Sequence, residues 1–245
     1  LPKDSGIVHA SWLEAAPTLL QAIDQSAAIC LLNPFAGSTP FLFEGLAPLF
    51  QRTAPTELLL LIAHKQAETR LLPFLRTPAG ASAFTSFLRS DRWKTLLAGD
   101  TATEHTVDGL IDAFLVSIQQ QHFLTVQRIA LLKHAGPAVV EPIPYTLIFA
   151  TRRQDSLASM NDAVCDYRRR LHEQSHRGVL TEEWFAAQQR EHLADDMQQL
   201  YQRILRQGRT QRPRRWPDLR QQMMIGSFGQ FTLHDYDQVV CKLLQ

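Results

Sequence analysis

The 245-residue sequence is poor in cysteine and lacks any long apolar run. Its three cysteines, Cys30, Cys165 and Cys241, lie far apart and form no Cys-x-x-Cys pair, so we expect reduced thiols rather than a disulfide framework or a zinc ribbon. The best apolar run, Leu58–Ala63, is far shorter than the ~20 residues of a membrane helix, and no apolar signal-peptide segment opens the chain. These absences predict a cytoplasmic protein without membrane contact.

The sequence has no marked excess of positive or negative charge. The chain holds 25 Lys and Arg against 24 Asp and Glu, a net charge of +1, so bulk charge indicates no class of partner. Residues 1–150 hold 10 basic and 12 acidic side chains, whereas residues 151–245 hold 15 and 12, and all but one of those 15 are arginine. Because the planar arginine fork suits phosphate groups, any nucleic-acid contact is expected in the second part.

The overall composition indicates a folded chain. Hydrophobic residues make up 45% of the sequence and charged residues 20%, which is too apolar for a disordered protein. The length corresponds to one large domain or two smaller ones. The chain begins with Leu1 instead of methionine, so we expect a processed, trimmed or partial product.

The apolar pattern predicts an α/β domain over residues 1–153. Ala27–Leu32 and Glu57–Ala63 are short unbroken apolar runs, typical of buried strands that pair in parallel. Ser11 and Glu14 form a capping-box pattern that begins a helix. The expected helices are 11–23, 41–50, 82–98 and 106–134, and two further strands are expected at 138–143 and 145–150. Strands that alternate with helices predict a mostly parallel sheet, and the final close pair predicts an antiparallel hairpin at its edge.

Residues 154–245 predict a separate, all-helical domain. The expected helices are 156–176, 181–207, 217–224 and 232–244, with a basic connector at 208–215. Thr232 and Asp235 form the cap of the last helix, and a glycine-containing turn precedes it. Helix, short turn and helix make a helix-turn-helix pattern.

The first predicted strand stops at Asn33-Pro34-Phe35, a turn that could carry chemistry. Ligands of open α/β sheets bind at the carboxyl ends of the strands. An Asn oxygen and the proline-adjacent carbonyl can accept hydrogen bonds from an exocyclic amine, and an aromatic ring can stack on a base, similar to the catalytic loop of amino-methyltransferases. The alternative is that Asn-Pro only ends the strand. His64 follows the second strand and faces the same crevice in this reading, unless it is structural.

Longer segments carry a resemblance to a known family: LLNPFAG, ELLLLIAH, PYTLIFATR followed by MNDAVCDYR, and RPRRWPDLRQQMMIGSFGQFTLHDYD. They resemble the three-Cys-motif partner protein family, which is similar to class I, S-adenosylmethionine-dependent methyltransferases with a helical or winged-helix-like C-terminal part. The resemblance implies a partial Rossmann-like sheet, with Ala27–Leu32 as its fourth strand, Leu58–Ala63 as its fifth and the 138–150 pair as the last two. It also implies methyl transfer to a base or another amine. The predicted catalytic residues are then Asn33, Pro34, Phe35 and His64.

The chain departs from the methyltransferase pattern at the cofactor site. That site needs an earlier strand that ends in a glycine-rich turn, where cofactor and backbone approach closely. The eleven glycines contain no Gly-x-Gly pair, and the first predicted strand already begins at Ala27. We therefore expect a fragment or remnant that cannot bind S-adenosylmethionine unless the missing N-terminal half is supplied. The uncovered sheet of such a half-domain predicts a partner protein or self-association.

The run HEQSH at 172–176 matches the His-Glu-x-x-His pattern of zinc proteases, in which two histidines one helical turn apart bind zinc and the glutamate activates water. Arg168–Arg170 precede the run and Arg177 follows it, and their charges repel a dication. A third ligand would be Glu191 or His192. We therefore expect a solvated, charged helix and no zinc site, with a zinc metalloprotease as the less favoured alternative.

Arginines also cluster towards the last two helices. Trp216 lies inside this cluster, and Asp218 is the one acidic residue between 203 and 220. Arginines beside an aromatic ring indicate a nucleic-acid footprint, whose predicted contacts are Arg209, Arg212, Arg214, Arg215 and Trp216. The alternative is a basic surface with Trp216 as a core anchor. Two classes of function stay open: a methyltransferase-like enzyme, or a non-catalytic adaptor that binds nucleic acid or protein.

Overall fold

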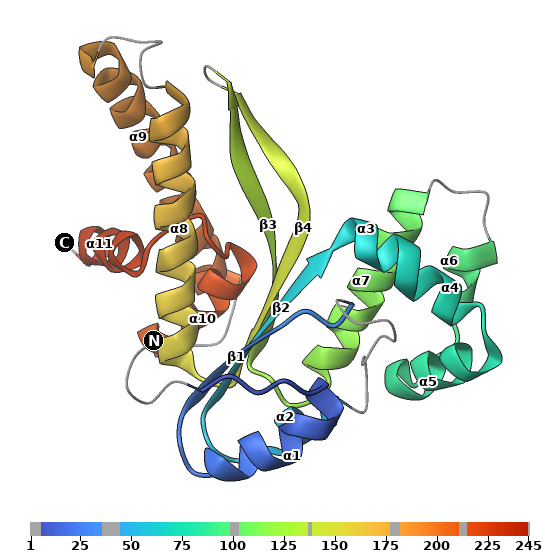
Figure 1. Cartoon of the computed structure of the whole chain (residues 1–245). Helices are drawn as coiled ribbons and strands as arrows, with labels where there is room; N and C mark the ends of the chain where they lie inside the picture. The colour runs from blue at the N-terminus through green and yellow to red at the C-terminus, as the bar shows by residue number, and fades with distance from the viewer. Residues whose placement is uncertain are drawn as a thin grey trace. The chain divides into compact units, whose positions relative to one another are not determined.

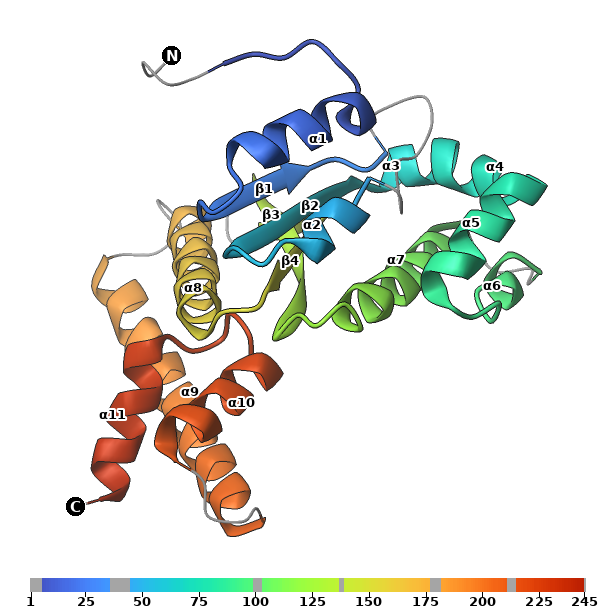
Figure 2. The same cartoon turned by 90° about the horizontal axis from the view of Figure 1, so that it is seen from below.

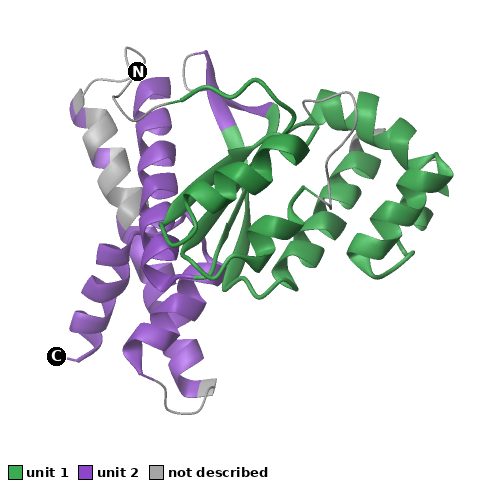
Figure 3. Cartoon of the chain, turned by 60° about the horizontal axis from the view of Figure 1, so that its bottom comes forward, with its two compact units in different colours: residues 1–131, 144–152 green, residues 132–143, 153–245 purple. Residues whose placement is uncertain are grey.

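The computed structural model describes residues 6–35, 45–98, 103–136, 139–176, 182–210 and 215–244. The chain divides into two compact units, which Figure 3 shows in different colours. Unit 1 is made of residues 1–131 and 144–152, and unit 2 of residues 132–143 and 153–245. The end of a β-hairpin thus belongs to unit 2 together with the C-terminal helices. The domain limits 1–153 and 154–245 stay a prediction.

A mixed sheet joins the first two strands of the chain to this hairpin (Figures 1 and 2). Among the described residues it has four strands in the order β1-β2-β4-β3: β1 (Ala28–Leu32), β2 (Thr56–Ala63), β3 (Thr125–Gly136) and β4 (Val139–Thr151). β1 and β2 are parallel, with Ala28 opposite Thr56, which confirms the predicted parallel pairing. β4 runs antiparallel to β2, with Leu58 opposite Ala150.

Helices of unit 1 bury one face of this sheet. They are α1 (Trp12–Ala22), α2 (Ala47–Gln51), α3 (His64–Gln66), the π-helix η1 (Ala67–Leu71), α4 (Leu72–Leu75), α5 (Pro78–Leu88), α6 (Lys94–Ala98) and α7 (Thr103–Gln119). Leu58, Leu60 and Ile62 alternate along β2 and are fully buried. They share a core with the apolar face of α7, which includes Leu110 and Phe114 at helical spacing. Ser11 and Glu14 form the capping box of α1, as predicted.

The predicted helix 106–134 is wrong in its second half. Helix α7 ends at Gln119, and β3 begins at Thr125. Four polar residues at 119–122 interrupt the apolar pattern, and His122 turns the backbone with a φ of 63°. Apolar residues continue beyond this turn, and the predicted helix therefore continued into residues 125–134. Pairing with β4 makes this segment a strand.

The predicted strands 138–143 and 145–150 are a single strand, β4, whose hairpin partner is β3. β4 contains Pro142 and Pro144, although proline cannot donate to a ladder. Pairing of β4 with β2 ends at Tyr145, so the two prolines, which lack an N–H, lie where no β2 residue requires a donor. Residues 137–138 are outside the described residues.

Other predicted helices of unit 1 need smaller corrections. The predicted helix 82–98 is two helices, α5 and α6, because Arg89 adopts a left-handed backbone with a φ of 51°. Of the predicted helix 41–50, the described part is α2, and residues 41–44 are outside the described residues. The helical segment His64–Leu75 was not predicted.

Unit 2 has the predicted helical C-terminal region. Its helices are α8 (Gln154–His176), α9 (Glu182–Thr210), α10 (Trp216–Gly226) and α11 (Leu233–Leu243). Thr232 and Asp235 form a capping box at the start of α11, as predicted. In the described part of the chain, no helix combines the length and apolar character needed to cross a membrane.

Candidate functional site

Asn33 and His64 lie at the same edge of the sheet. Asn33 directly follows the last residue of β1, and His64 directly follows the last residue of β2. Because β1 and β2 are parallel, their carboxyl ends meet at one edge. The structure therefore brings these two predicted site residues to neighbouring strand ends in unit 1.

Two hydrogen bonds hold the side chain of Asn33. Its Oδ1 accepts from the backbone N–H of Phe35 at 3.2 Å, and its Nδ2 donates to Oε1 of Gln66 at 3.1 Å. A carbonyl oxygen has two lone pairs, so Oδ1 keeps the capacity to accept from one further donor. The amide is thus oriented by the protein and can still accept a hydrogen bond from an amine.

Pro34 and Phe35 have a different environment. Both are buried, and the Phe35 ring is only 2% exposed within the hydrophobic core. Nη1 of Arg70 donates to the Phe35 carbonyl oxygen at 2.8 Å and fixes the turn from the other side. A ring that stacks on a base needs a solvent-facing surface, which Phe35 does not have in this conformation. Its observed contacts are those of a core anchor.

His64 contacts the next strand of the sheet. Its Nε2 lies 2.8 Å from Oγ1 of Thr146, a buried residue on β4. A hydroxyl can serve either ring tautomer, and it fixes the orientation of the imidazole. The second ring nitrogen, Nδ1, is then the atom of this edge that could exchange a proton with a ligand.

The π-helix η1 and the residue before it carry the side chains that the sequence analysis missed. Gln66 and Arg70 bind the Asn33–Phe35 turn; Gln66 directly precedes η1, and Arg70 lies in its last turn. Single π-turns occur often at functional sites, because the extra residue re-aims the neighbouring side chains. Neither Gln66 nor Arg70 belongs to a motif, so only a structure could reveal their role.

The predicted nucleic-acid contacts lie in unit 2, in part. Arg209 at the end of α9 and Arg215 before α10 are exposed, while Arg212 and Arg214 are outside the described residues. Trp216 is half-buried, and its Nε1 donates to Oδ1 of Asp237 on α11 at 2.9 Å. This hydrogen bond ties the start of α10 to α11, which supports the role of a structural anchor.

Asp237 also binds an arginine near Trp216: Nη1 of Arg220 donates to its Oδ1 at 2.6 Å. Another arginine of this part of the chain, Arg203, donates from Nη1 to Oγ of Ser227 at 2.8 Å. Arginines 203 and 220 therefore serve the internal structure of unit 2.

The HEQSH run occupies the last turns of α8. The rings of His172 and His176 are 4.2 Å apart, as expected for positions one helical turn apart. Nδ1 of His176 lies 2.9 Å from Oγ of Ser175 and 2.9 Å from the carbonyl oxygen of His172. The side chains of the proposed third ligands, at positions 191 and 192, are outside the description. Among the described residues, no group of three or more His, Cys, Asp or Glu could hold a metal ion.

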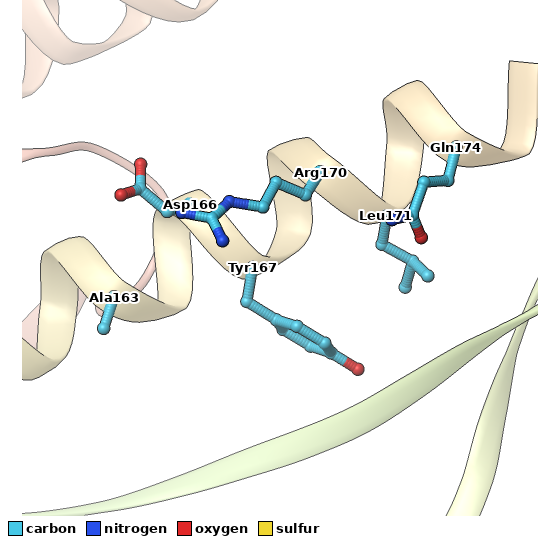
Figure 4. Close-up of a pocket in the computed structure, with 6 residues that line it drawn as sticks. All are labelled: Ala163, Asp166, Tyr167, Arg170, Leu171 and Gln174. Carbon is cyan, nitrogen blue, oxygen red and sulfur yellow. The ribbon is translucent and has the colours of Figure 1, made fainter. Parts of the chain in front are cut away.

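A cavity of about 490 Å³ lies along the middle of α8. Figure 4 shows its lining residues Ala163, Asp166, Tyr167, Arg170, Leu171 and Gln174. The Tyr167 ring points towards the hairpin, where its hydroxyl donates to the carbonyl oxygen of Leu132 and accepts from the Leu132 N–H at 2.7 Å. The hydroxyl is therefore used to hold β3, and the cavity offers no paired acid and base.

The sheet edge with Asn33 and His64 is thus the best candidate site. An oriented amide and an oriented imidazole lie there at the carboxyl ends of two neighbouring parallel strands. The described residues add no glycine-rich turn beside it, and the sheet ends at β1. Comparison of the chain with protein-family models, curated proteins and solved structures found no match.

Proposed function

We propose that this chain is the substrate-side half of a methyltransferase-like fold related to the three-Cys-motif partner proteins. It does not bind S-adenosylmethionine alone and acts by association with another polypeptide. In such a fold the cofactor supplies the methyl group, and the residues present here would orient the acceptor. The helix-turn-helix-like end formed by α10 and α11 belongs to the same proposal.

The strand order carries this proposal. A parallel pair followed by an antiparallel hairpin, in the order β1-β2-β4-β3, agrees with the mapping of these strands to the fourth, fifth and last two of a methyltransferase sheet. The remaining strands would continue from β1, which has no further neighbour among the described residues. The absence of a Gly-x-Gly pair from the sequence supports the inability to bind the cofactor.

Asn33 and His64 would have separate roles in the completed site. Oδ1 of Asn33 would accept a hydrogen bond from the acceptor amine and thereby orient its lone pair. His64, held by Thr146, would take up the proton that the amine loses. Both roles use atoms at the carboxyl edge of the sheet.

Calorimetric titration with S-adenosylmethionine tests the proposal. The isolated chain is expected to show no binding, whereas a complete class I methyltransferase under the same conditions shows a normal isotherm. Saturable binding by the isolated chain would contradict it. A radiolabelled methyl-transfer assay with mixed nucleic acid and protein adds a second readout. Incorporation that disappears in Asn33→Ala would assign catalysis to the chain alone.

Nucleic-acid binding is the second proposed function. It would rest on the exposed Arg209 and Arg215 together with Arg212 and Arg214. Each phosphate contact steepens the plot of log affinity against log salt by about one. The triple variant of residues 212, 214 and 215 to alanine should flatten the slope by about two to three. Arg153→Ala, which removes an exposed arginine elsewhere, is the matched control.

A further inference from the structure

Among the described residues, the outer edge of β1 has backbone groups without a strand partner. The N–H of Ala28 donates to the carbonyl oxygen of Pro55 at 2.9 Å, so the even-numbered residues of β1 bond to β2. Successive residues of a strand direct their N–H and C=O groups to opposite sides. The N–H and C=O groups of Ile29 and Leu31 therefore point away from β2. Within the described residues, no other strand pairs with this edge.

The side chains of Ile29 and Leu31 are apolar and lie on the exposed face of β1, opposite to Cys30 and Leu32, which pack against the core. Ile29 is 74% exposed and Leu31 is 64% exposed. Natural edge strands usually carry lysine, proline or an inward charge that prevents pairing, and Ala28–Leu32 contains none of these. Other exposed apolar side chains lie earlier in the chain, at Ile7, Val8, Leu13 and Leu19.

The opposite edge strand of the sheet is protected. Leu132 of β3 has both its N–H and its C=O hydrogen-bonded to the Tyr167 hydroxyl from α8. A side chain thus occupies backbone groups that another strand could use. At Leu132, β3 is therefore less available for pairing than the outer edge of β1.

We propose that β1 pairs with β1 of a second copy of this chain, antiparallel and about a two-fold axis at Cys30. In this register Ile29 lies opposite the second copy's Leu31, and each such pair exchanges both of its backbone hydrogen bonds. The exposed apolar side chains of the two copies then lie beside each other on the same face of the joined sheet, where cross-strand pairs contact. A shift in either direction would place one of these side chains opposite Ala27 or Asn33 instead.

The second copy is the favoured occupant because the strand is complementary to itself. Its outward residues are symmetric about Cys30, and it carries no charge that would repel an identical strand. The pairing needs only the edge of β1, so it does not depend on the proposed methyltransferase relationship. A polypeptide that supplies the missing strands would compete for the same edge.

Sedimentation equilibrium at micromolar concentration tests this pairing with a matched pair of variants. Leu31→Lys places a charge on the edge, and Val116→Lys places one at a similarly exposed position, 60%, on α7. The chain is expected to be a dimer. Leu31→Lys should raise its dissociation constant by about 30-fold or more, the scale of losing an interface anchor, and Val116→Lys should leave it unchanged. A monomeric wild-type chain, or equal effects of both variants, would overturn the proposal.

Cross-linking at Cys30 tests the register. At the non-hydrogen-bonded position of an antiparallel pair the two Cα atoms are about 4.5 Å apart, close enough for a disulfide. The Cys241→Ser variant lacks the exposed thiol of the chain. Burial raises the pKa of Cys165 to about 12, so the Cys165 thiol stays protonated and unreactive. Under an added oxidant, two Cys30 thiols lose two protons and two electrons and form one bond between chains.

A covalent dimer is therefore expected on a non-reducing gel for Cys241→Ser. The double variant Cys30→Ser with Cys241→Ser should give none. Because burial also raises the pKa of the Cys30 thiol, the reaction is run at alkaline pH. A non-covalent dimer that gives no Cys30 cross-link, or that survives Leu31→Lys, would show that another surface forms the dimer and would overturn the proposal.

Discussion

The side chain of Asn161 on α8 accepts a hydrogen bond from the backbone N–H of Gly229 at 2.8 Å. The same amide donates to the carbonyl oxygen of Phe231 at 2.7 Å. Asn161 is fully buried, and the two backbone groups belong to the turn between α10 and α11. One side chain thus fastens the turn to α8, and the MNDAVCDYR segment meets the GSFGQFTLHDYD segment at this point.

Asn161→Ala should destabilise the protein by about 2–4 kcal/mol, because it leaves a buried N–H and a buried C=O without their partner. The free energy of unfolding from urea denaturation measures the loss. Ser159→Ala, at an exposed position on the same helix, should change that free energy by no more than about 0.5 kcal/mol. Equal stabilities of the two variants would contradict the role of Asn161.

Gly229→Ala should destabilise the same turn by about 1–3 kcal/mol, the scale of a strained backbone and a local steric overlap. Gly229 has a φ of 70°, and an added Cβ would lie 2.5 Å from Cγ1 of Val164. Gly226→Ala is the control, since a Cβ there meets no atom within 4 Å. In thermal unfolding, Gly229→Ala should have the lower Tm of the two variants. A Tm at or above that of Gly226→Ala would contradict the predicted strain at Gly229.

Arg152→Met should lower the stability of unit 1 by about 2–3 kcal/mol, because two carbonyl oxygens lose their donor and a cation–π contact is lost. Its guanidinium donates to the carbonyl oxygens of Arg52 at 2.9 Å and Phe50 at 2.6 Å, and lies 4.7 Å from the centre of the Phe123 ring. Burial lowers the pKa of this guanidinium. The neighbour Arg153 is exposed, so Arg153→Ala should cost less than about 1 kcal/mol. Denaturant titration compares the two.

The pKa of Asp155 gives a prediction on acid stability. The Arg153 guanidinium, which is hydrogen-bonded to this carboxylate, lowers the pKa of Asp155 to about 2. A carboxyl group whose pKa is lower in the folded than in the unfolded chain adds stability above its ordinary pKa, near ~4. That contribution declines as the pH falls from about 4 towards 2. Carboxyl-carbon NMR titration should show the pKa of Asp155 rising towards its ordinary value in Arg153→Gln. An unchanged value in that variant would exclude the Arg153 pair as the cause.

Features with local causes could be predicted from the sequence. The capping boxes of α1 and α11 each join residues three positions apart, so their patterns are visible in the printed chain. β1 and β2 are short apolar runs, and their parallel pairing followed from that composition. The predicted burial is confirmed for β2 and is wrong for β1, where Ile29 and Leu31 are exposed. The missed strand depends on its pairing partner. Residues 125–136 form a strand because they pair with β4 in a hairpin, although their apolar residues follow the helical pattern of α7.

The candidate site divides in the same way. The sequence by itself determined that a turn with Asn33 and a histidine at 64 would follow two short apolar strands, because strand ends and turn residues are local properties. Only the tertiary structure decided that Phe35 is buried, that Gln66 and Arg70 hold the turn, and that His64 binds Thr146, a residue 82 positions away. It likewise paired Trp216 with Asp237 and Asn161 with Gly229. These contacts join distant segments, and their energies depend on the desolvation that folding creates.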